Sequence, residues 1–260
     1  MFDFITWATG LGVILGVGIL VWLGSLVRRD ASLVDRFWSL LFVAAGFTYA
    51  LATPAATGTR RLLVLALVAV WALRLAVYLT WRNWGAGEDY RYVAMRKRFG
   101  EDRFPLISLP YVFGMQGVLA WLVSMPLLAA VDGTRPLGWL DGVGVAVFGV
   151  GLVFEVVGDW QLTRFKADPA NAGKVMDRGL WGLTRHPNYF GDFAVWWGLF
   201  LIGLSAGGWW AVGGPIVMSI LLMRVSGAAL LERSLTKTKP RYEEYVRNVN
   251  AFFPGPRRKA

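Results

Sequence analysis

Long uncharged apolar segments are the dominant feature of this 260-residue sequence. A helix needs about 20 predominantly apolar residues to cross the ~30 Å hydrocarbon core of a bilayer. Residues 4–27 carry no charge and are followed by two arginines, an order opposite to that of a cleavable signal peptide. Residues 193–223 are too long for one ordinary crossing, so we divide them at Gly207 and Gly208. The seven predicted spans are residues 4–27, 37–53, 62–81, 104–131, 137–158 and the two parts of 193–223.

Basic residues are unevenly distributed between these spans. Of the 27 Lys and Arg residues, 23 lie in segments 28–36, 82–103, 164–185 and 224–260. Because cytoplasmic loops collect Lys and Arg, we predict an all-α integral membrane bundle with its N-terminus outside and its C-terminus in the cytoplasm. This orientation requires an odd number of spans. The net charge of +10 follows from the topology, so no nucleic-acid partner is needed to explain it.

Composition excludes several kinds of site. The chain has no Cys, which rules out disulfides and thiolate metal sites, and its one His, His186, rules out a multi-His metal site. We therefore predict no metal. No period of 20 to 50 residues recurs and no low-complexity linker divides the chain, so residues 1–260 are predicted to form a single membrane domain.

Two segments outside the predicted spans are expected to form interfacial helices. Residues 82–103 place aromatic side chains among Arg and Lys, and residues 240–250 place Tyr242, Tyr245 and Val249 on one helical face. Interfacial helices of this kind lie against the headgroup region and do not cross the bilayer.

Two pairs of glycines have the spacing of close helix packing in membranes. They are Gly12 with Gly16, and Gly203 with Gly207. In a chain with 31 glycines, the two pairs are equally well explained as ordinary small residues.

Several polar side chains fall at membrane depth, where a charge costs at least ~2.5 kcal/mol on insertion scales. Glu155 and Asp159 are four residues apart and therefore share one helical face. Arg74 and Tyr78 have the same spacing in the third span, and Asp35 opens the second. These positions gather at one membrane level, which favours a pocket. The alternative is an interhelical ion pair, such as Arg74 with Asp35 or Glu155, that serves packing alone.

The densest group of polar side chains precedes the sixth span. Within eight residues the chain carries a cation, an imidazole, an amide, a phenol and a carboxylate, namely Arg185, His186, Asn188, Tyr189 and Asp192. These donors and acceptors suit an anionic, hydrogen-bonding ligand. Alternatively, Pro187 and Asn188 merely cap the sixth span, and His186 by itself is more simply explained as a structural residue.

Further charges follow the seventh span, among them Arg224, Glu232, Arg233, Lys237, Lys239 and Arg241. A phosphate-rich cofactor on the cytoplasmic face would meet cations from three separate segments, although any one of these cations could be an ordinary cytoplasmic-loop residue. Soluble-type nucleotide motifs are absent from the sequence, so a nucleotide would have to be held between helices.

The segment Arg185–Asp192 reads Arg-His-Pro-Asn-Tyr-Phe-Gly-Asp. With Gly179–Gly182 before it and Tyr242–Pro254 after it, this segment resembles the C-terminal half of the steroid 5-alpha-reductase superfamily, and most of all its bacterial branch of unknown function with a reductase-like C-terminal domain. The resemblance covers about residues 140–256. Sterol C-14 and C-7 reductases share the Asn-Tyr-x-Gly-Asp element. Isoprenylcysteine carboxyl methyltransferases, which bind S-adenosylmethionine, share Arg-His-Pro and Tyr, but the element at 188–192 is similar to the reductase form.

The resemblance implies that NADPH is the cofactor. The residues that it implies for the cofactor site are Asp159, Lys166, Trp181, Asn188, Tyr189, Glu232 and Tyr245, and Lys239 falls in an adjoining stretch that aligns only with a gap. Arg185, His186, Asp192 and Arg224 join the predicted site because of their chemistry and position. In this interpretation Lys166, Arg185 and the C-terminal cations bind phosphates, whereas Asn188 and Asp159 orient the nicotinamide half.

The sequence departs from the resemblance at the proton donor. The 5-alpha-reductases use a Tyr where this chain has Trp71, and an indole cannot donate an acidic proton. Tyr78, Asp35 and Glu155 are the candidate catalytic residues, bordering a pocket that opens to lipid.

We therefore expect a multi-pass membrane enzyme, located in a bacterial inner membrane, that reduces a carbon–carbon double bond of a lipophilic substrate with NADPH. A steroid, sterol or isoprenoid-like substrate is expected, and membrane lipids are the other expected partner. One alternative is a methyltransferase of the isoprenylcysteine carboxyl methyltransferase type that uses S-adenosylmethionine. A further alternative is a lipid-binding or transport protein without turnover. The sequence does not identify the substrate or the oligomeric state.

Overall fold

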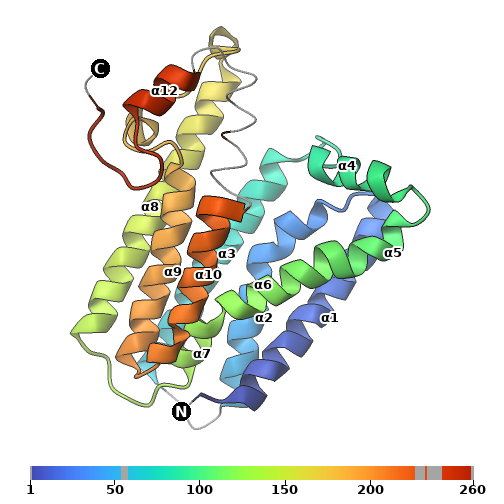
Figure 1. Cartoon of the computed structure of the whole chain (residues 1–260). Helices are drawn as coiled ribbons and strands as arrows, with labels where there is room; N and C mark the ends of the chain where they lie inside the picture. Colours follow the sequence, from blue (N-terminus) through green and yellow to red (C-terminus); the bar gives the residue numbers. More distant parts are fainter. Residues whose placement is uncertain (1, 54–57, 226–231, 233–241, 259–260) are drawn as a thin grey trace. The chain divides into compact units, whose positions relative to one another are not determined.

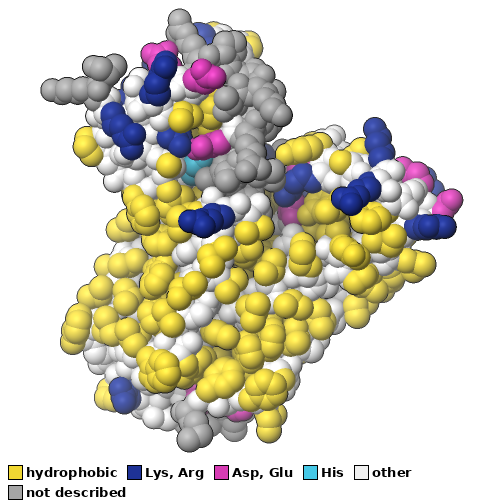
Figure 2. Space-filling model, in the orientation of Figure 1, with side chains coloured by type: hydrophobic (Ala, Val, Ile, Leu, Met, Phe, Trp, Pro, Cys, Tyr) yellow, Lys and Arg dark blue, Asp and Glu magenta, His cyan; other side chains and the backbone are white. Residues whose placement is uncertain are grey.

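The structure, a computed structural model, describes residues 2–53, 58–225, 232 and 242–258. All regular secondary structure in these residues is helical, which confirms the predicted all-α class. Four helical segments are long and apolar enough to cross a membrane: Phe4–Arg28, Thr59–Arg82, Phe104–Val123 and Trp139–Ala167. Hydrophobic side chains also cover much of the visible surface (Figure 2). Both features are consistent with an integral membrane protein, whereas seven crossings and the orientation of the termini stay predictions.

The helices belong to two compact units (Figure 1). The N-terminal unit comprises the residues up to Gly138 together with Ile202–Gly214, and the C-terminal unit comprises Trp139–Leu201 and the residues from Pro215 onward. The N-terminal unit contains α1 (Phe4–Arg28), α2 (Leu33–Ala52), α3 (Thr59–Arg82), α4 (Tyr90–Phe99), α5 (Phe104–Ser108), a π-helical turn (Leu109–Gly114), α6 (Met115–Val123) and α7 (Met125–Val131).

In the N-terminal unit, α2 packs against both α1 and α3. The buried hydroxyl groups of Tyr49 and Ser124 share a hydrogen bond of 2.7 Å, which fixes α2 against the end of α6. Trp7 and Trp121 stack with ring centroids 3.6 Å apart and join α1 to α6. Because large aromatic side chains bury much surface, these contacts help to hold α1, α2 and α6 together.

The predicted fourth span, residues 104–131, is wrong as a single helix. The structure ends α6 at Val123 and starts α7 at Met125, with Ser124 between them. Pro126 lies at the start of α7, where its missing N–H removes no helical hydrogen bond. The proline therefore explains why an uninterrupted apolar run does not give an uninterrupted helix.

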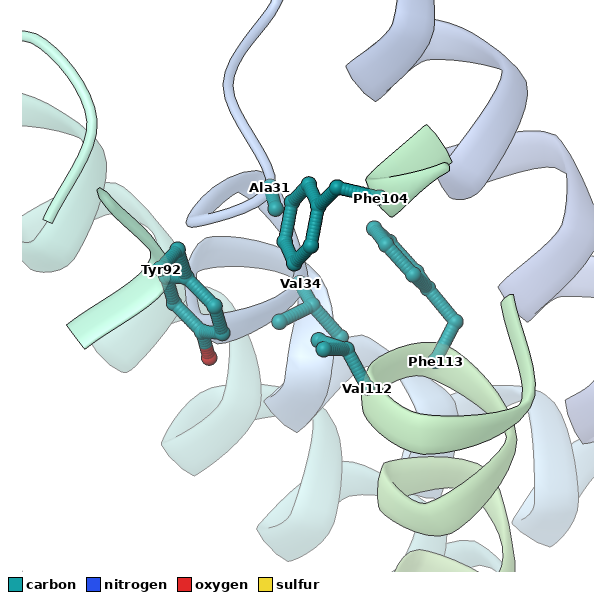
Figure 3. Close-up of a cluster of buried hydrophobic side chains, with 6 residues drawn as sticks. All are labelled: Ala31, Val34, Tyr92, Phe104, Val112 and Phe113. Atoms are coloured by element: carbon teal, nitrogen blue, oxygen red, sulfur yellow. The ribbon is translucent and has the colours of Figure 1, made fainter. Parts of the chain in front are cut away.

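Residues 82–103 contain a helix, as predicted, namely α4 (Tyr90–Phe99), whereas its place at the membrane interface stays a prediction. The Asp89 side chain caps it by accepting a hydrogen bond of 3.0 Å from the Arg91 amide. Figure 3 shows the buried cluster that α4 joins: Tyr92 of α4 lies with Phe104 of α5, two residues of the π-helical turn, Ala31 just before α2, and Val34 in its first turn. The remaining members of that cluster are Val112 and Phe113.

The C-terminal unit is built on the long helix α8. Its elements are α8 (Trp139–Ala167), the 3-10 turns Pro169–Asn171 and Gly179–Gly182, α9 (Pro187–Ser205), α10 (Gly213–Ile220), a π-helical turn (Leu221–Val225) and α12 (Tyr242–Asn248), with the first residues of α10 and the last of α9 assigned to the other unit. The interruption between α9 and α10 lies where the sequence predicts it.

Glycines bring α8 and α9 into backbone contact. A Cβ atom on Gly151 would lie 2.5 Å from the carbonyl oxygen of Gly191, and a Cβ atom on Gly191 would lie 2.5 Å from the carbonyl oxygen of Gly151. Small residues permit such close approach in membrane helices. At Gly12 and Gly16, by contrast, an added Cβ would meet nothing within 4 Å, so these two are ordinary small residues.

Candidate functional site

The segment 179–186 of the C-terminal unit is held on one side by α8. The indole Nε1 of Trp181 donates a 3.0 Å hydrogen bond to the carbonyl of Gly158, and the Gln161 side chain accepts one of 3.0 Å from the Leu180 amide. Gly179 has φ of +59°, a left-handed conformation that glycine adopts readily. These contacts fix the start of the segment against the last turns of α8.

The C-terminal residues hold the same segment on its other side. The hydroxyl of Tyr245 donates a 2.6 Å hydrogen bond to the carbonyl of Trp181, and the hydroxyl of Thr184 donates one of 2.7 Å to the carbonyl of Phe252. The Arg185 amide donates to the carbonyl of Asn250 at 2.9 Å. On α12, Tyr242, Tyr245 and Val249 form a buried cluster. The predicted apolar face of this helix is therefore confirmed.

Arg185 is the central cation of this arrangement. Its Nη1 donates to the carbonyls of Val246 and Val249, at 3.0 and 2.7 Å, and its Nε donates to Glu232 Oε1 at 2.7 Å. A cation at the C-terminal end of a helix satisfies carbonyls that have no partner within the helix. Arg185 therefore caps α12, a role that local sequence patterns did not suggest.

Glu232 joins Arg185 to His186. One carboxylate oxygen, Oε1, accepts from Arg185 Nε and lies 2.9 Å from His186 Nε2. Burial alone would raise the pKa of Glu232, but the hydrogen bonds from His186 and Arg185 outweigh it and hold that pKa at about 2, below the ordinary 4.5. Glu232 is therefore ionised at neutral pH.

His186 is almost completely buried, with 1% of its surface exposed, and its ring stacks on Tyr189 at 5.5 Å. Because Nε2 faces a carboxylate, it carries a proton, and Nδ1 is then an acceptor in the neutral ring and a donor in the charged ring. Nδ1 is buried and has no hydrogen-bond partner among the residues that the structure describes. A buried polar atom without a partner is costly, so Nδ1 is suited to a ligand or a water.

The hydroxyl of Tyr242 is a second polar group of this kind. It too is buried without a hydrogen-bond partner in the described part of the chain. Burial and then the charge of Glu232 raise the pKa of Tyr242 to about 12, so this hydroxyl stays protonated and can donate. We name these residues the Glu232 cluster: Trp181, Arg185, His186, Glu232, Tyr242 and Tyr245.

Other predicted cofactor residues lie on neighbouring elements of the same unit. Asn188, Tyr189 and Asp192 are partly buried in the first turns of α9, and Glu155 and Asp159 are buried on α8. Lys166, near the end of α8, and Arg224, in the π-helical turn, are exposed. Lys239 lies outside the described residues.

One protein-family model matches most of the chain. The sequence model described as "Protein of unknown function (DUF1295)" matches residues 21–249. The chain belongs to the DUF1295 family. The part that matches DUF1295 includes all of the Glu232 cluster and the helices α4 and α12.

Three curated relatives are similar to parts or most of this DUF1295 chain. The uncharacterized protein C594.04c of Schizosaccharomyces pombe is 26% identical over 273 aligned positions, covering 92% of this chain and 76% of that protein. The probable O-methyltransferase ustE of Ustilaginoidea virens is 45% identical over 53 residues, 20% of this chain and 18% of that protein. A putative cardiolipin synthase of Mycobacterium tuberculosis is 29% identical over 82 residues, 28% of this chain and 39% of that protein. No solved structure matches the chain.

In the N-terminal unit of this DUF1295 protein, the predicted catalytic residue Asp35 binds several donors. Its Oδ2 accepts from Arg91 Nη2 at 2.7 Å, and its Oδ1 accepts from the Tyr92 hydroxyl at 2.9 Å and from Gln116 at 3.4 Å. Asp35 thus joins α2, α4 and α6. The sequence suggested Arg74 as its partner and did not suggest Arg91.

Tyr78 and Trp71 lie on α3. The guanidinium groups of Arg74 and Arg82 each lie 5.5 Å from the centre of the Tyr78 ring, within cation–π range. Trp71 is fully buried and meets the Phe42 ring edge-on. Glu155, the third predicted catalytic residue, belongs to the C-terminal unit.

Proposed function

We propose that this DUF1295 protein is a membrane-embedded reductase that uses NADPH to reduce a carbon–carbon double bond of a lipophilic substrate. The proposed cofactor site is the Glu232 cluster. The observation that carries this proposal is the pair of buried polar atoms without partners, His186 Nδ1 and the Tyr242 hydroxyl. The relation of the family to steroid 5-alpha-reductase-like proteins favours a reductase over other enzymes.

The residues of the cluster suit a nucleotide cofactor. His186 Nδ1 offers an acceptor for an amide or ribose hydroxyl, and the Tyr242 hydroxyl offers a donor. Arg185 already donates hydrogen bonds to Glu232 and to the carbonyls of Val246 and Val249. We therefore assign phosphate binding to exposed cations such as Lys166 and Arg224. NADPH would supply a hydride to the substrate. The chain's own residues would orient it and exclude water from it.

Methyl transfer is the second candidate function. A 53-residue stretch is 45% identical to a probable O-methyltransferase, which favours this alternative. His186, with Glu232 on its Nε2, has an Nδ1 able to accept the proton of an oxygen nucleophile. The two candidates place different cofactors at the same cluster, so a binding experiment separates them.

The experiment measures thermal unfolding of the purified full-length chain with NADPH or with S-adenosylmethionine. We expect NADPH to raise Tm and S-adenosylmethionine to leave it unchanged. Tyr242→Phe removes one buried hydroxyl and should weaken NADPH binding about tenfold, the size of one well-placed hydrogen bond. Tyr90→Phe, at an exposed position of α4, is the matched control and should bind as the unchanged protein does.

The outcomes are distinct. Stabilisation by S-adenosylmethionine alone would replace the reductase with the methyltransferase, and stabilisation by neither would contradict both. A chemical test follows from the first result: incubation with deuterated NADPH and membrane lipid extract should yield a deuterium-labelled, more saturated lipid by mass spectrometry. Unlabelled lipids in the presence of bound NADPH would contradict reduction while leaving the binding site intact.

A further inference from the structure

A groove of about 440 Å³ runs between α2 and α3 in the N-terminal unit. Phe37 and Leu40 of α2 line one wall, and Leu73, Val77 and Trp81 of α3 line the other. These side chains are well exposed: 41% of Phe37, 67% of Val77 and 61% of Trp81 is uncovered. The groove therefore offers a concave apolar surface to an apolar ligand.

The surroundings of α3 identify that occupant. Thr59–Arg82 is long and apolar enough to cross a membrane, so the molecules that meet its exposed face are lipid acyl chains. Trp81 lies at the end of α3 and Trp84 just beyond it, and both line the groove. Because Trp side chains gather at the level of the headgroups, this end of the groove lies near the glycerol esters of the bilayer.

Arg36 lines the same groove and is the charged residue among its lining residues. Its side chain is only 9% exposed, and its Nη2 pairs with Asp30 Oδ2 at 2.9 Å. Its Nε is buried and has no hydrogen-bond partner in residues 2–53, 58–225, 232 and 242–258. The Nε–H of Arg36 is therefore a hydrogen-bond donor without a partner in the described residues, on a side chain that lines the apolar groove.

The charge balance decides which acceptor suits this donor. Asp30 already neutralises the guanidinium, and its other oxygen accepts from the Ser32 amide at 3.0 Å. A second anion would meet a pair with no net charge, so a phosphate gains little there. A neutral carbonyl oxygen satisfies the Nε–H without adding charge.

We propose that this groove is a lipid site, in which one acyl chain of a glycerophospholipid lies along α3 and its ester carbonyl accepts a hydrogen bond from Arg36 Nε. This site is separate from the Glu232 cluster and does not depend on the reductase proposal. It holds a lipid in a fixed register on the N-terminal unit.

The test uses the full-length protein in vesicles containing a phosphatidylcholine with a photoreactive diazirine on its acyl chain. We expect labelling to concentrate on the peptide that contains Leu73, Val77 and Trp81, compared with the exposed face of α1. Val77→Trp fills the groove and should abolish this label. Val70→Trp, also exposed on α3 but outside the groove lining, is the matched control and should leave it unchanged.

Two further experiments test the hydrogen bond from Arg36 Nε to the ester carbonyl. A diether analogue of the same lipid lacks the ester carbonyl and should compete about tenfold more weakly than the diester, as expected for one lost hydrogen bond to a charged group. Arg36→Lys, which keeps the charge but loses Nε, should weaken the diester by a similar factor. Equal labelling in Val77→Trp and Val70→Trp would contradict the binding of an acyl chain in the groove. Equal competition by the diether and the diester would contradict the hydrogen bond from Arg36.

Discussion

Two groups of charged and polar side chains in this protein differ in how many of their hydrogen-bonding atoms have a partner. In the N-terminal unit, Glu88 accepts from the Ala31 amide at 2.8 Å and from two nitrogens of Arg96 at 2.8 and 3.0 Å, while Asp35 accepts from three donors. In the Glu232 cluster, His186 Nδ1 and the Tyr242 hydroxyl have no partner among the described residues. The first group fastens α4 to its unit. The second has hydrogen-bonding capacity left for a ligand.

Replacement of Arg185 should have the largest effect on stability. Arg185→Leu removes a side chain that is 9% exposed, and with it one hydrogen bond to Glu232 and the two to the carbonyls of Val246 and Val249, so we expect a loss of about 3 kcal/mol. Arg91→Leu in the α4 network should cost only about 1 kcal/mol, because that side chain is 39% exposed. Denaturant unfolding in detergent measures both. Equal losses would contradict the central role of Arg185.

A methyl group between α8 and α9 should have the next largest effect. Gly191→Ala places a Cβ 2.5 Å from the Gly151 carbonyl oxygen and should lower stability by about 2 kcal/mol through overpacking. Gly12→Ala is the control, since nothing lies within 4 Å of its added Cβ, and it should match the unchanged protein or exceed it slightly. If Gly191→Ala left stability unchanged as well, α8 and α9 would be able to separate enough to admit a methyl group, which would contradict the tight packing inferred here.

Acid should weaken the Glu232 cluster in a defined pH range. The folded-state pKa of Glu232 lies at about 2, below its ordinary 4.5, so this carboxylate stabilises the fold above pH 4.5 and loses that contribution as the pH falls from 4.5 to about 2. Tm measured across this range should fall less steeply in Glu232→Gln than in the unchanged protein. Parallel curves would show that Glu232 does not contribute through its charge.

The two tyrosines of α12 should give the smallest and clearest contrast. Tyr245→Phe loses the hydrogen bond to the Trp181 carbonyl and should cost about 1 kcal/mol. Tyr242→Phe removes a hydroxyl without a partner in the described chain and should change the stability of the ligand-free protein by less than about 0.5 kcal/mol. The same unfolding measurement compares them. A larger loss in Tyr242→Phe would mean that its hydroxyl is structural.

The sequence predicted features that depend on local periodicity. The apolar face of α12, with Tyr242, Tyr245 and Val249, follows from helical spacing and is confirmed. The resemblance placed Trp181 and Tyr245 in one site. The hydrogen bond from the Tyr245 hydroxyl to the Trp181 carbonyl confirms that these two residues lie together. The role of these residues in binding a cofactor stays a prediction.

Features that depend on pairing between distant residues could not be predicted in this way. Arg91 binds Asp35 across 56 positions, and Arg185 caps a helix that begins 57 positions later in the chain. Neither pairing leaves a local pattern, because each depends on how the helices pack. The break at Ser124 did have a local signal in Pro126, but the uncharged run around it masked that signal.

The contact between Gly151 and Gly191 has a mechanical consequence. With so little room for even a methyl group at either glycine, the two helices meet backbone to backbone, and any side chain between them would have to push them apart. A Cβ on Gly191 would also lie 2.7 Å from the Glu155 side chain, and a Cβ on Gly158 would lie 3.2 Å from Pro187. Backbone packing therefore sets the spacing between the buried carboxylate Glu155 on α8 and the first turn of α9.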